Sequence, residues 1–297
     1  MSSLKRCKPY SAQPSSVVRQ PDSRSNRPFV RTLTRFAMLV AITGVCLCDP
    51  RGTHVLAKTG QAAASTNDSS EIDADAIDAV KKMGAYLRTL KSFQVIDNSS
   101  HDDVLEDGLI VQTNSKIDLL AAPPNRLRVE VTSDEKHRLY LYDGKNFTLW
   151  ARVVNYYATV PAPPTIGQLF TVADEKYGID LPLYDLFNWG THDDDINRIK
   201  TAVDVGPSAV EGVTCEHYAF HQEGVDWQIW IQLGEFPLPR KLVITTLTDE
   251  ARPQHSDTLT WNLAPSFNDG AFVFNPPADA KRILLAEEKP DATQNER

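Results

Sequence analysis

Cys215 and His217 are the residues best suited to nucleophilic chemistry, because a thiol beside an imidazole can form a reactive thiolate. Residues i and i+2 share one face of a strand, and their Cα atoms lie about 6.7 Å apart. A buried structural cysteine is nevertheless far commoner than a catalytic one. The sequence also holds no G-x-S-x-G, H-E-x-x-H, C-x-x-C or phosphate-binding glycine loop. We therefore predict that the protein is not an enzyme and holds no cofactor.

Two acidic clusters offer oxygen atoms that calcium or magnesium could bind, residues 101–103 (HDD) and residues 192–195 (HDDD). Neither has the ligand spacing and turn glycine of a calcium loop. His217 and His221 lie about 13 Å apart if they share a strand, too far to bind one ion together. We interpret the clusters as solvated turns and expect no metal site.

The segment that carries Cys215 predicts three consecutive antiparallel strands over residues 214–248. A turn at Gly224 joins the first two strands, and the prolines of GEFPLP break the ladder before the third. Trp227, Ile229 and Ile231 share one face of the middle strand, because side chains alternate along a strand. That face must be covered by something apolar.

The rest of the chain predicts one helix and further short strands. The helix begins after Asp73, a suitable N-cap, and its Gly84 predicts close packing against the sheet. Two short apolar helices interrupt the strands, at residues 165–176 and 181–189. Short strands are expected from Phe93 onward. They are predicted at residues 108–120, 126–131, 139–149 (a hairpin with an Asp-Gly turn), 156–160, 202–205, 214–248, 254–263 and 271–274. Such a sheet can close into a barrel or curl around the helices.

The N-terminal region resembles a secretory signal peptide. A basic flank (residues 31–35) precedes twelve apolar residues (36–47), too short a run for the roughly 20 residues that span a bilayer. Cys215 is the one cysteine outside this region, and Val45 and Leu47 do not suit a lipoprotein cleavage site. The predicted organisation is an extension with signal peptide (1–64), a linker (65–72), one domain (73–285) and a disordered tail (286–297).

The charge of the chain is unevenly distributed. Residues 1–64 hold ten Lys and Arg and two acidic residues, which leaves 21 basic and 37 acidic residues in the remainder. Nucleic acids and anionic membranes are bound by basic patches, so this acidic surface argues against both as partners.

Four segments of the chain resemble a family of predicted periplasmic proteins of unknown function within the LolA/LolB-like superfamily of lipoprotein carriers. They are KKMGAYLRTLKSFQV (81–95), YYATVPAPPTI (156–166), YGIDLPLYDLFNWG (177–190) and HYAFHQEGVDWQIWIQ (217–232). The resemblance implies a mainly β (α+β) fold: a single, highly curved antiparallel sheet of about eleven strands, a half-barrel with an N-terminal helix and a helical lid in its concave face. Arg126 and Arg128 are alternatives for the carriers' lid-locking arginine.

The resemblance and the apolar insertion together predict a soluble periplasmic protein of a Gram-negative bacterium. Its partner would be a lipid or lipoprotein acyl chain in a cavity between sheet and lid, with at most transient membrane contact. The alternative is an envelope protein-binding or sensor module that transports no lipid. The candidate cavity residues are Leu127, Val129, Leu139, Leu141, Phe147, Leu149, Phe170, Phe187, Trp189, Trp227, Ile229 and Ile231. A packed core is the competing interpretation of the same residues.

Overall fold

The computed structural model describes residues 72–189 and 196–287. The predicted signal peptide, the acidic cluster at residues 192–195 and most of the predicted tail lie outside these residues. The described residues belong to one unit, Lys58–Arg297. Among its described helices, none has the length and apolar character needed to cross a membrane.

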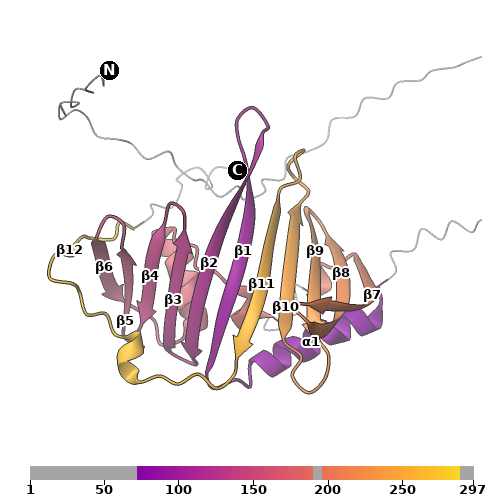
Figure 1. Ribbon diagram of the computed structural model, residues 1–297, viewed down its shortest axis with the longest axis horizontal. Coiled ribbons are helices and arrows are strands. Elements are labelled where there is room, and N and C mark those ends of the chain that lie inside the picture. Colours follow the sequence, from indigo (N-terminus) through magenta and orange to yellow (C-terminus); the bar gives the residue numbers. More distant parts are fainter. Residues whose placement is uncertain (1–71, 190–195, 288–297) are drawn as a thin grey trace, which may run out of the picture. The chain divides into compact units, whose positions relative to one another are not determined.

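A single mixed sheet of twelve strands forms the framework (Figure 1). All neighbouring strands are antiparallel except β12, which pairs with β6 in parallel. The strands are β1 (Phe93–Val104), β2 (Ile110–Ala122), β3 (Arg126–Ser133), β4 (His137–Tyr142), β5 (Asn146–Ala151), β6 (Tyr156–Pro161), β7 (Thr201–Val210), β8 (Val213–Gln222), β9 (Val225–Gln232), β10 (Pro239–Thr246), β11 (Gln254–Asn262) and β12 (Lys281–Arg282). Their spatial order is β12-β6-β5-β4-β3-β2-β1-β11-β10-β9-β8-β7.

The sheet consists of two hairpin series that β11 joins. Strands β1 to β6 follow one another along the chain and in space, and so do β7 to β10. Only β11 lies between the two series, because it pairs with β1 on one side and with β10 on the other. The helical insertion therefore separates two half-sheets that a later strand connects.

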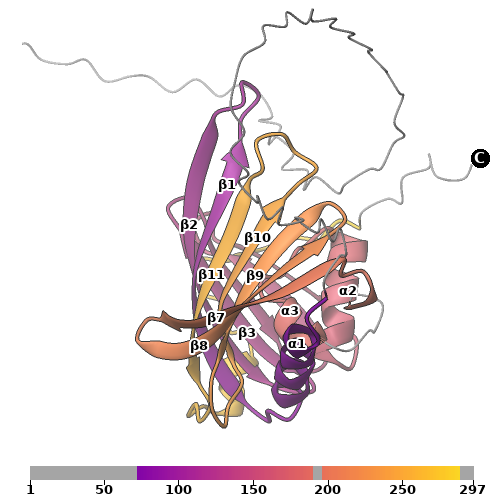
Figure 2. The same cartoon turned by 90° about the vertical axis from the view of Figure 1, so that its right-hand side faces the viewer.

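Three α-helices lie on the same side of the sheet (Figure 2). They are α1 (Ala74–Leu87), α2 (Ile166–Tyr177) and α3 (Asp185–Asn188). As predicted, Asp73 is the N-cap of α1, where its side chain accepts a hydrogen bond from the Asp75 amide at 2.8 Å. Helix α2 ends at Gly178, whose φ of 60° is the left-handed conformation that glycine adopts readily. The second predicted insertion helix is much shorter than residues 181–189.

Each half-sheet packs against its own helices. The first cluster combines strands β1 to β5 and β11 with α2 and α3, and the second combines β7 to β10 with α1. The predicted alternation of β3 and β9 is confirmed, since Leu127 and Val129 are buried in the first cluster and Ile229 and Ile231 in the second. Both clusters lie between the sheet and the helices, where apolar burial stabilises the fold.

The opposite face of β4 and β5 is also covered. Residues 271–274 do not form the predicted strand, because η1 (Asp269–Phe272) is a 3₁₀ helix that contacts β3. Phe272 is fully buried. The Phe274 ring lies 5.6 Å from Trp150 and 5.0 Å from Tyr157. These aromatic contacts hold the C-terminal segment against the side of the sheet that faces away from the helices.

Gly84 allows α1 to approach the end of α3 closely. A Cβ atom at this position would lie 2.5 Å from the Trp189 carbonyl oxygen, and the Arg88 guanidinium donates to the same oxygen at 2.6 Å. The close approach predicted for Gly84 is present, but the neighbour is helical-insertion backbone and not the sheet.

Candidate functional site

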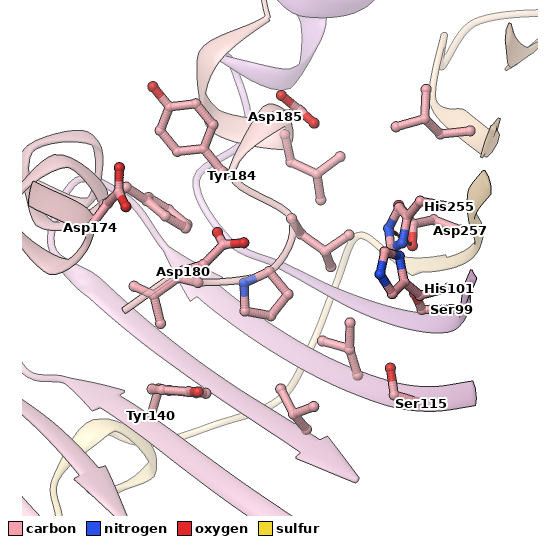
Figure 3. A pocket seen from close by; sticks show the side chains of 18 of the residues that line it. Ser99, His101, Ser115, Tyr140, Asp174, Asp180, Tyr184, Asp185, His255 and Asp257 are labelled. Atoms are coloured by element: carbon pink, nitrogen blue, oxygen red, sulfur yellow. Dashed lines mark hydrogen bonds and ion pairs between the residues drawn. The ribbon is translucent and has the colours of Figure 1, made fainter. Parts of the chain in front are cut away.

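A cavity of about 910 Å³ lies between the helical insertion and the inner face of the sheet, which is the face that the three helices cover (Figure 3). Its walls come from α2, the loop between α2 and α3, α3 itself, and strands β1 to β4, β10 and β11. The volume falls within the range that small-molecule sites occupy in proteins, about 300–1,000 Å³. The cavity is thus large enough for an elongated organic ligand.

One part of the cavity wall is apolar. Its side chains come from the sheet and from the insertion: Ile117, Val131, Tyr140, Leu242, Ile244 and Leu259 from strands, and Phe170, Leu181, Leu183, Leu186 and Trp189 from the insertion. Helix α2 places Phe170 there, because the apolar face of this amphipathic helix packs on the sheet. The Phe170 ring contacts Tyr184 and Phe187, each at 5.3 Å between centroids.

The loop between α2 and α3 adopts an unusual backbone conformation. Leu183, which lines the cavity, has a φ of 61°. A side chain larger than glycine adopts this left-handed conformation at a cost, and such strain often occurs at ligand sites. The surrounding contacts therefore hold the loop over the cavity.

The other part of the wall is polar and is centred on Asp257. The His255 imidazole Nε2 lies 3.0 Å from an Asp257 carboxylate oxygen. Figure 3 shows His255, Asp257, His101 and Ser99 grouped on one wall, with Asp180 and Asp185 on the insertion across the cavity. The His101 and His255 rings lie 5.8 Å apart. The full set of polar lining residues is Ser99, His101, Ser115, Lys136, Arg138, Thr171, Asp174, Glu175, Asp180, Tyr184, Asp185, His255 and Asp257.

Asp97 lies behind this polar wall and is fully buried. One carboxylate oxygen, Oδ1, accepts from the Thr258 amide at 3.1 Å. The other, Oδ2, has no hydrogen-bond donor within the described part of the chain. Burial raises the pKa of Asp97 to about 8, with the Asp257 charge and a hydrogen bond to Asp257 adding to the effect. Asp97 therefore carries a proton at neutral pH, and that proton serves the interaction with Asp257.

The polar side chains on the sheet and those on the insertion interact electrostatically across the cavity. The hydrogen bond to Asp257 raises the pKa of His255 against the opposing effect of burial, and the charges of Asp185 and Asp180 raise it further. Asp180 is exposed, yet the partial loss of solvent around its carboxyl group raises its pKa, and the charge of Asp174 raises it further. The negative charges of Asp180 and Asp185 on the insertion thus favour the protonated form of His255 on β11.

A second, smaller cavity of about 250 Å³ lies next to the first. The two cavities share part of their walls: Tyr184, Asp185, Trp189, Leu242 and Ile244 line both. Helix α3 and strand β10 therefore form a partition between the two spaces.

The structure brings only three of the twelve predicted residues to these cavities. Phe170 and Trp189 line the larger cavity, while Trp189 and Trp227 line the smaller one. Seven others pack in the two core clusters: Leu127, Val129, Phe147, Leu149, Phe187, Ile229 and Ile231. Leu139 and Leu141 point away from the helices, because they alternate with Tyr140 and Tyr142, which pack in the first cluster.

Cys215 and His217 do not line the cavity. The Cys215 thiol is buried and donates to the Val213 carbonyl at 3.4 Å, and burial raises its pKa. His217 stacks on Trp230 at 3.9 Å between ring centroids. A thiol without a depressed pKa is a poor nucleophile, so this environment fits the structural role. Across residues 72–189 and 196–287, no group of three or more His, Cys, Asp or Glu could hold a metal ion.

Neither candidate arginine lines the cavity. The Arg128 guanidinium pairs with Glu130 at 2.5 Å, and Arg126 donates to Asn125. Leu127 faces the helices. Since neighbouring side chains alternate along a strand, Arg126 and Arg128 leave β3 on the face away from the helices.

Sequence reasoning missed Asp97, Asp257, His255 and Asp180. A usable signal was present in the alternation of FQVID at the start of β1, where Asp97 follows Phe93 and Val95 at the core-facing parity. A carboxylate at such a position needs a specific partner. The partner is on β11, about 160 residues later, which local patterning does not reveal.

The solved structures to which this chain is similar have low sequence identity to it and TM-scores below 0.5. Lipoprotein LppX of Mycobacterium tuberculosis is 10% identical with a TM-score of 0.42, covering 66% of this chain and all of its own. An uncharacterized conserved protein from Thermus thermophilus is 11% identical (TM-score 0.40; coverage 71% and 97%). A LolA superfamily protein from Nitrosomonas europaea is 8% identical (TM-score 0.34; coverage 67% and 97%). At such identities no residue role carries over to this chain.

The model of a protein family matches most of the domain. Its description is "Predicted periplasmic protein (DUF2092)", and the match covers residues 76–286. No curated protein matches the chain significantly.

Proposed function

Because this chain belongs to the DUF2092 family of predicted periplasmic proteins, we propose that it is a non-enzymatic binding protein of the periplasm. Its ligand is apolar, a lipid or a lipoprotein acyl chain, and it occupies the cavity between the sheet and the insertion. The sheet serves as a half-barrel, and the insertion serves as its lid. A cleaved N-terminal signal peptide exports the protein in a Gram-negative bacterium, and residues 73–285 are the functional domain.

The observation that carries this proposal is the large cavity whose apolar wall is contributed by both sheet and lid. Burying an alkyl chain gains about 0.8 kcal/mol per methylene group, so ten methylenes gain roughly 8 kcal/mol before ordering costs. That gain is sufficient for micromolar binding without a charged contact. An apolar ligand would therefore be held by the residues already in place.

Lipid analysis of the periplasmic protein tests the proposal. Mass spectrometry should find a co-purifying lipid, and the delipidated protein should take up a fluorescent fatty acid or a neutral apolar dye. Val131 lines the cavity on the sheet side, so Val131→Trp should fill the cavity and abolish uptake. The next side chain, Thr132, points away from the helices, so Thr132→Trp should leave uptake unchanged. Preparations without lipid, together with equal uptake by both variants, would overturn the proposal.

Protein binding is the second candidate function, and the β1–β2 hairpin supports it. The hairpin extends past its neighbours (Figure 1), and β1 pairs with β11 only as far as His101. Its tip exposes Leu105, Leu109, Ile110 and Val111, with side chains 40–58% accessible. Acidic residues surround them: Asp102, Asp103, Glu106 and Asp107. The complementary partner is an envelope protein with an apolar patch flanked by Lys or Arg.

A pull-down from periplasm with the delipidated protein distinguishes the two functions. Under the second, a stoichiometric partner binds the wild-type protein, and binding is lost in Leu109→Ser and in high salt. A partner retained by Leu109→Ser would exclude the hairpin tip as its binding surface.

A further inference from the structure

The inner face of the sheet changes from apolar to polar within one step of the strand register. Across β1, β2 and β3, one row of aligned residues is Val95, Leu119 and Val129, and the row two residues further is Asp97, Ile117 and Val131. The next row is Ser99, Ser115 and Ser133. On β11 the same change runs from Leu259 to Asp257 and His255.

This change orients any elongated ligand in the cavity. Ile117, Val131 and Leu259 line it on the apolar side, and Ser99, Ser115 and His255 line it on the polar side. A simple hydrocarbon would place methylene groups against these polar side chains, and taking polar groups out of water without a new hydrogen bond is costly. The lining therefore fits an amphiphile, with its chain on the apolar side and its head group on the polar side.

Carboxylates predominate in the polar part. The lining contains five acidic residues, namely Asp174, Glu175, Asp180, Asp185 and Asp257, against Lys136 and Arg138 and the two histidines, His101 and His255. Asp257 is nearly inaccessible to bulk water, so its charge is weakly screened. An anionic head group would add a like charge to this set, whereas a cationic one would offset it.

Asp97 supplies a second observation at the same place. Its Oδ2 atom is buried without a donor in the described part of the chain, and it lies beside Asp257. Two adjacent buried carboxyls tolerate only one negative charge. A cation delivered to Asp257 offsets the remaining charge of the pair, which a second anion cannot do.

We propose that the ligand is an amphiphile with a protonated amine head group, which binds between Asp257 on the sheet and Asp180 on the lid, with its alkyl chain against Ile117, Val131 and Leu259. This inference rests on the proposed function and specifies the ligand class of the same cavity. Asp257 accepts a hydrogen bond from the ammonium, and Asp180 supplies a second negative charge from the opposite side of the cavity. His255 Nε2, which lies 3.0 Å from Oδ1 and 3.1 Å from Oδ2 of Asp257, shares this carboxylate with the ammonium.

Displacement of a neutral apolar dye, N-phenyl-1-naphthylamine, by three ligands of equal chain length tests the inference. The ligands are decylamine, decanol and decanoate at pH 7, each kept below its micelle concentration. Decylamine should bind at least tenfold more tightly than decanoate and several-fold more tightly than decanol. The full chain without its leader, delipidated, is the protein to use.

Variants locate the head group. Asp180→Asn and Asp257→Asn should each weaken decylamine at least fivefold and leave decanol unchanged. Asp180 lies on the lid, so its variant should fold even if Asp257→Asn does not. Asp118→Asn is the matched control, because Asp118 contacts Gln94 outside the cavity and its loss changes the net charge equally.

The outcomes separate this inference from the proposed function. If none of the three ligands displaces the dye, and the dye itself does not bind, the cavity function fails. If all three bind equally, or decanoate binds best, the amine assignment is overturned while the cavity function stands. If decylamine is preferred equally by Asp180→Asn and Asp118→Asn, the assignment to Asp180 is overturned.

Discussion

Asp97 on β1 and Asp257 on β11 face the same side of the sheet from neighbouring register positions, with Asp97 opposite Leu259 and Asp257 opposite Ser99. Both are buried, and one of them must hold a proton at neutral pH. Burial, reinforced by Asp257, raises the pKa of Asp97 from 3.8 to about 8. The pair links the centre of the sheet to the wall of the cavity.

Stability should therefore fall as pH rises from about 4 to about 8. The unfolded chain releases the Asp97 proton near pH 4, whereas the folded protein keeps it until about pH 8. Since the folded state binds more protons in this window, the free energy of unfolding declines by up to about 1.4 kcal/mol per pH unit. The raised pKa of His255 acts in the same direction.

Urea unfolding at several pH values measures this decline. Asp97→Asn keeps the shape but cannot ionise, so it should flatten the slope and stabilise the protein above pH 7. Asp118→Asn should keep the wild-type slope. A wild-type stability that is constant or rises between pH 5 and 8 would contradict the assignment of the proton to Asp97.

Gly84→Ala should destabilise the protein by about 1–3 kcal/mol, which is typical of overpacking. In an open helix the same change stabilises by roughly 1 kcal/mol, but here the new methyl group meets the Trp189 carbonyl oxygen. Gly167→Ala in α2 is the matched control, because a Cβ there has no neighbour within 4 Å. Thermal unfolding of both variants gives the comparison. Equal stabilisation of the two would show that α1 does not contact Trp189 in solution.

Phe272→Ala should cost about 3–5 kcal/mol, the usual penalty for removing a fully buried aromatic ring. The ring belongs to the 3₁₀ helix on the face away from the cavity, so dye affinity of the folded variant should not change. Phe267 packs edge-to-face on Phe272 but is 37% accessible. Phe267→Ala should therefore lower the free energy of unfolding much less than Phe272→Ala. Denaturant unfolding and dye titration together check both points. A loss of affinity at normal stability would place Phe272 at the ligand site.

The Cys215 thiol should react slowly in the native protein. It is buried and its pKa is raised by that burial, and only the thiolate attacks a disulfide reagent. Reaction with an aromatic disulfide reagent, followed by absorbance at pH 8, should be at least a hundredfold slower than in urea. Rapid labelling of the native protein would show that this thiol is exposed or activated.

Alternation along single strands predicted much of the sheet, as the buried Leu127 and Val129 show. It failed where both faces are covered. All of residues 139–142 (LYLY) are buried, so the pattern does not say that Tyr140 faces the helices and Leu139 faces the C-terminal segment. Phe272 and Phe274 were misread as a strand for the same reason, since both serve that second interface.

The polar part of the cavity was beyond local sequence reasoning. Asp97 and Asp257 meet through the pairing of β1 with β11, and Asp180 lies across the cavity from Asp257 on the insertion loop. Each is an ordinary acidic residue in its own segment. The significance of Asp97 and Asp257 arises from tertiary neighbours that bury the two carboxyl groups together and raise the pKa of Asp97.

The position of β11 has a consequence for biogenesis. The halves of the sheet are formed by residues 93–161 and 201–246, yet the strand that unites them is Gln254–Asn262. Contacts of such long sequence separation form late and slowly. During the export proposed above, the two half-sheets therefore stay unjoined until β11 has emerged, and the cavity between sheet and insertion is completed only after that.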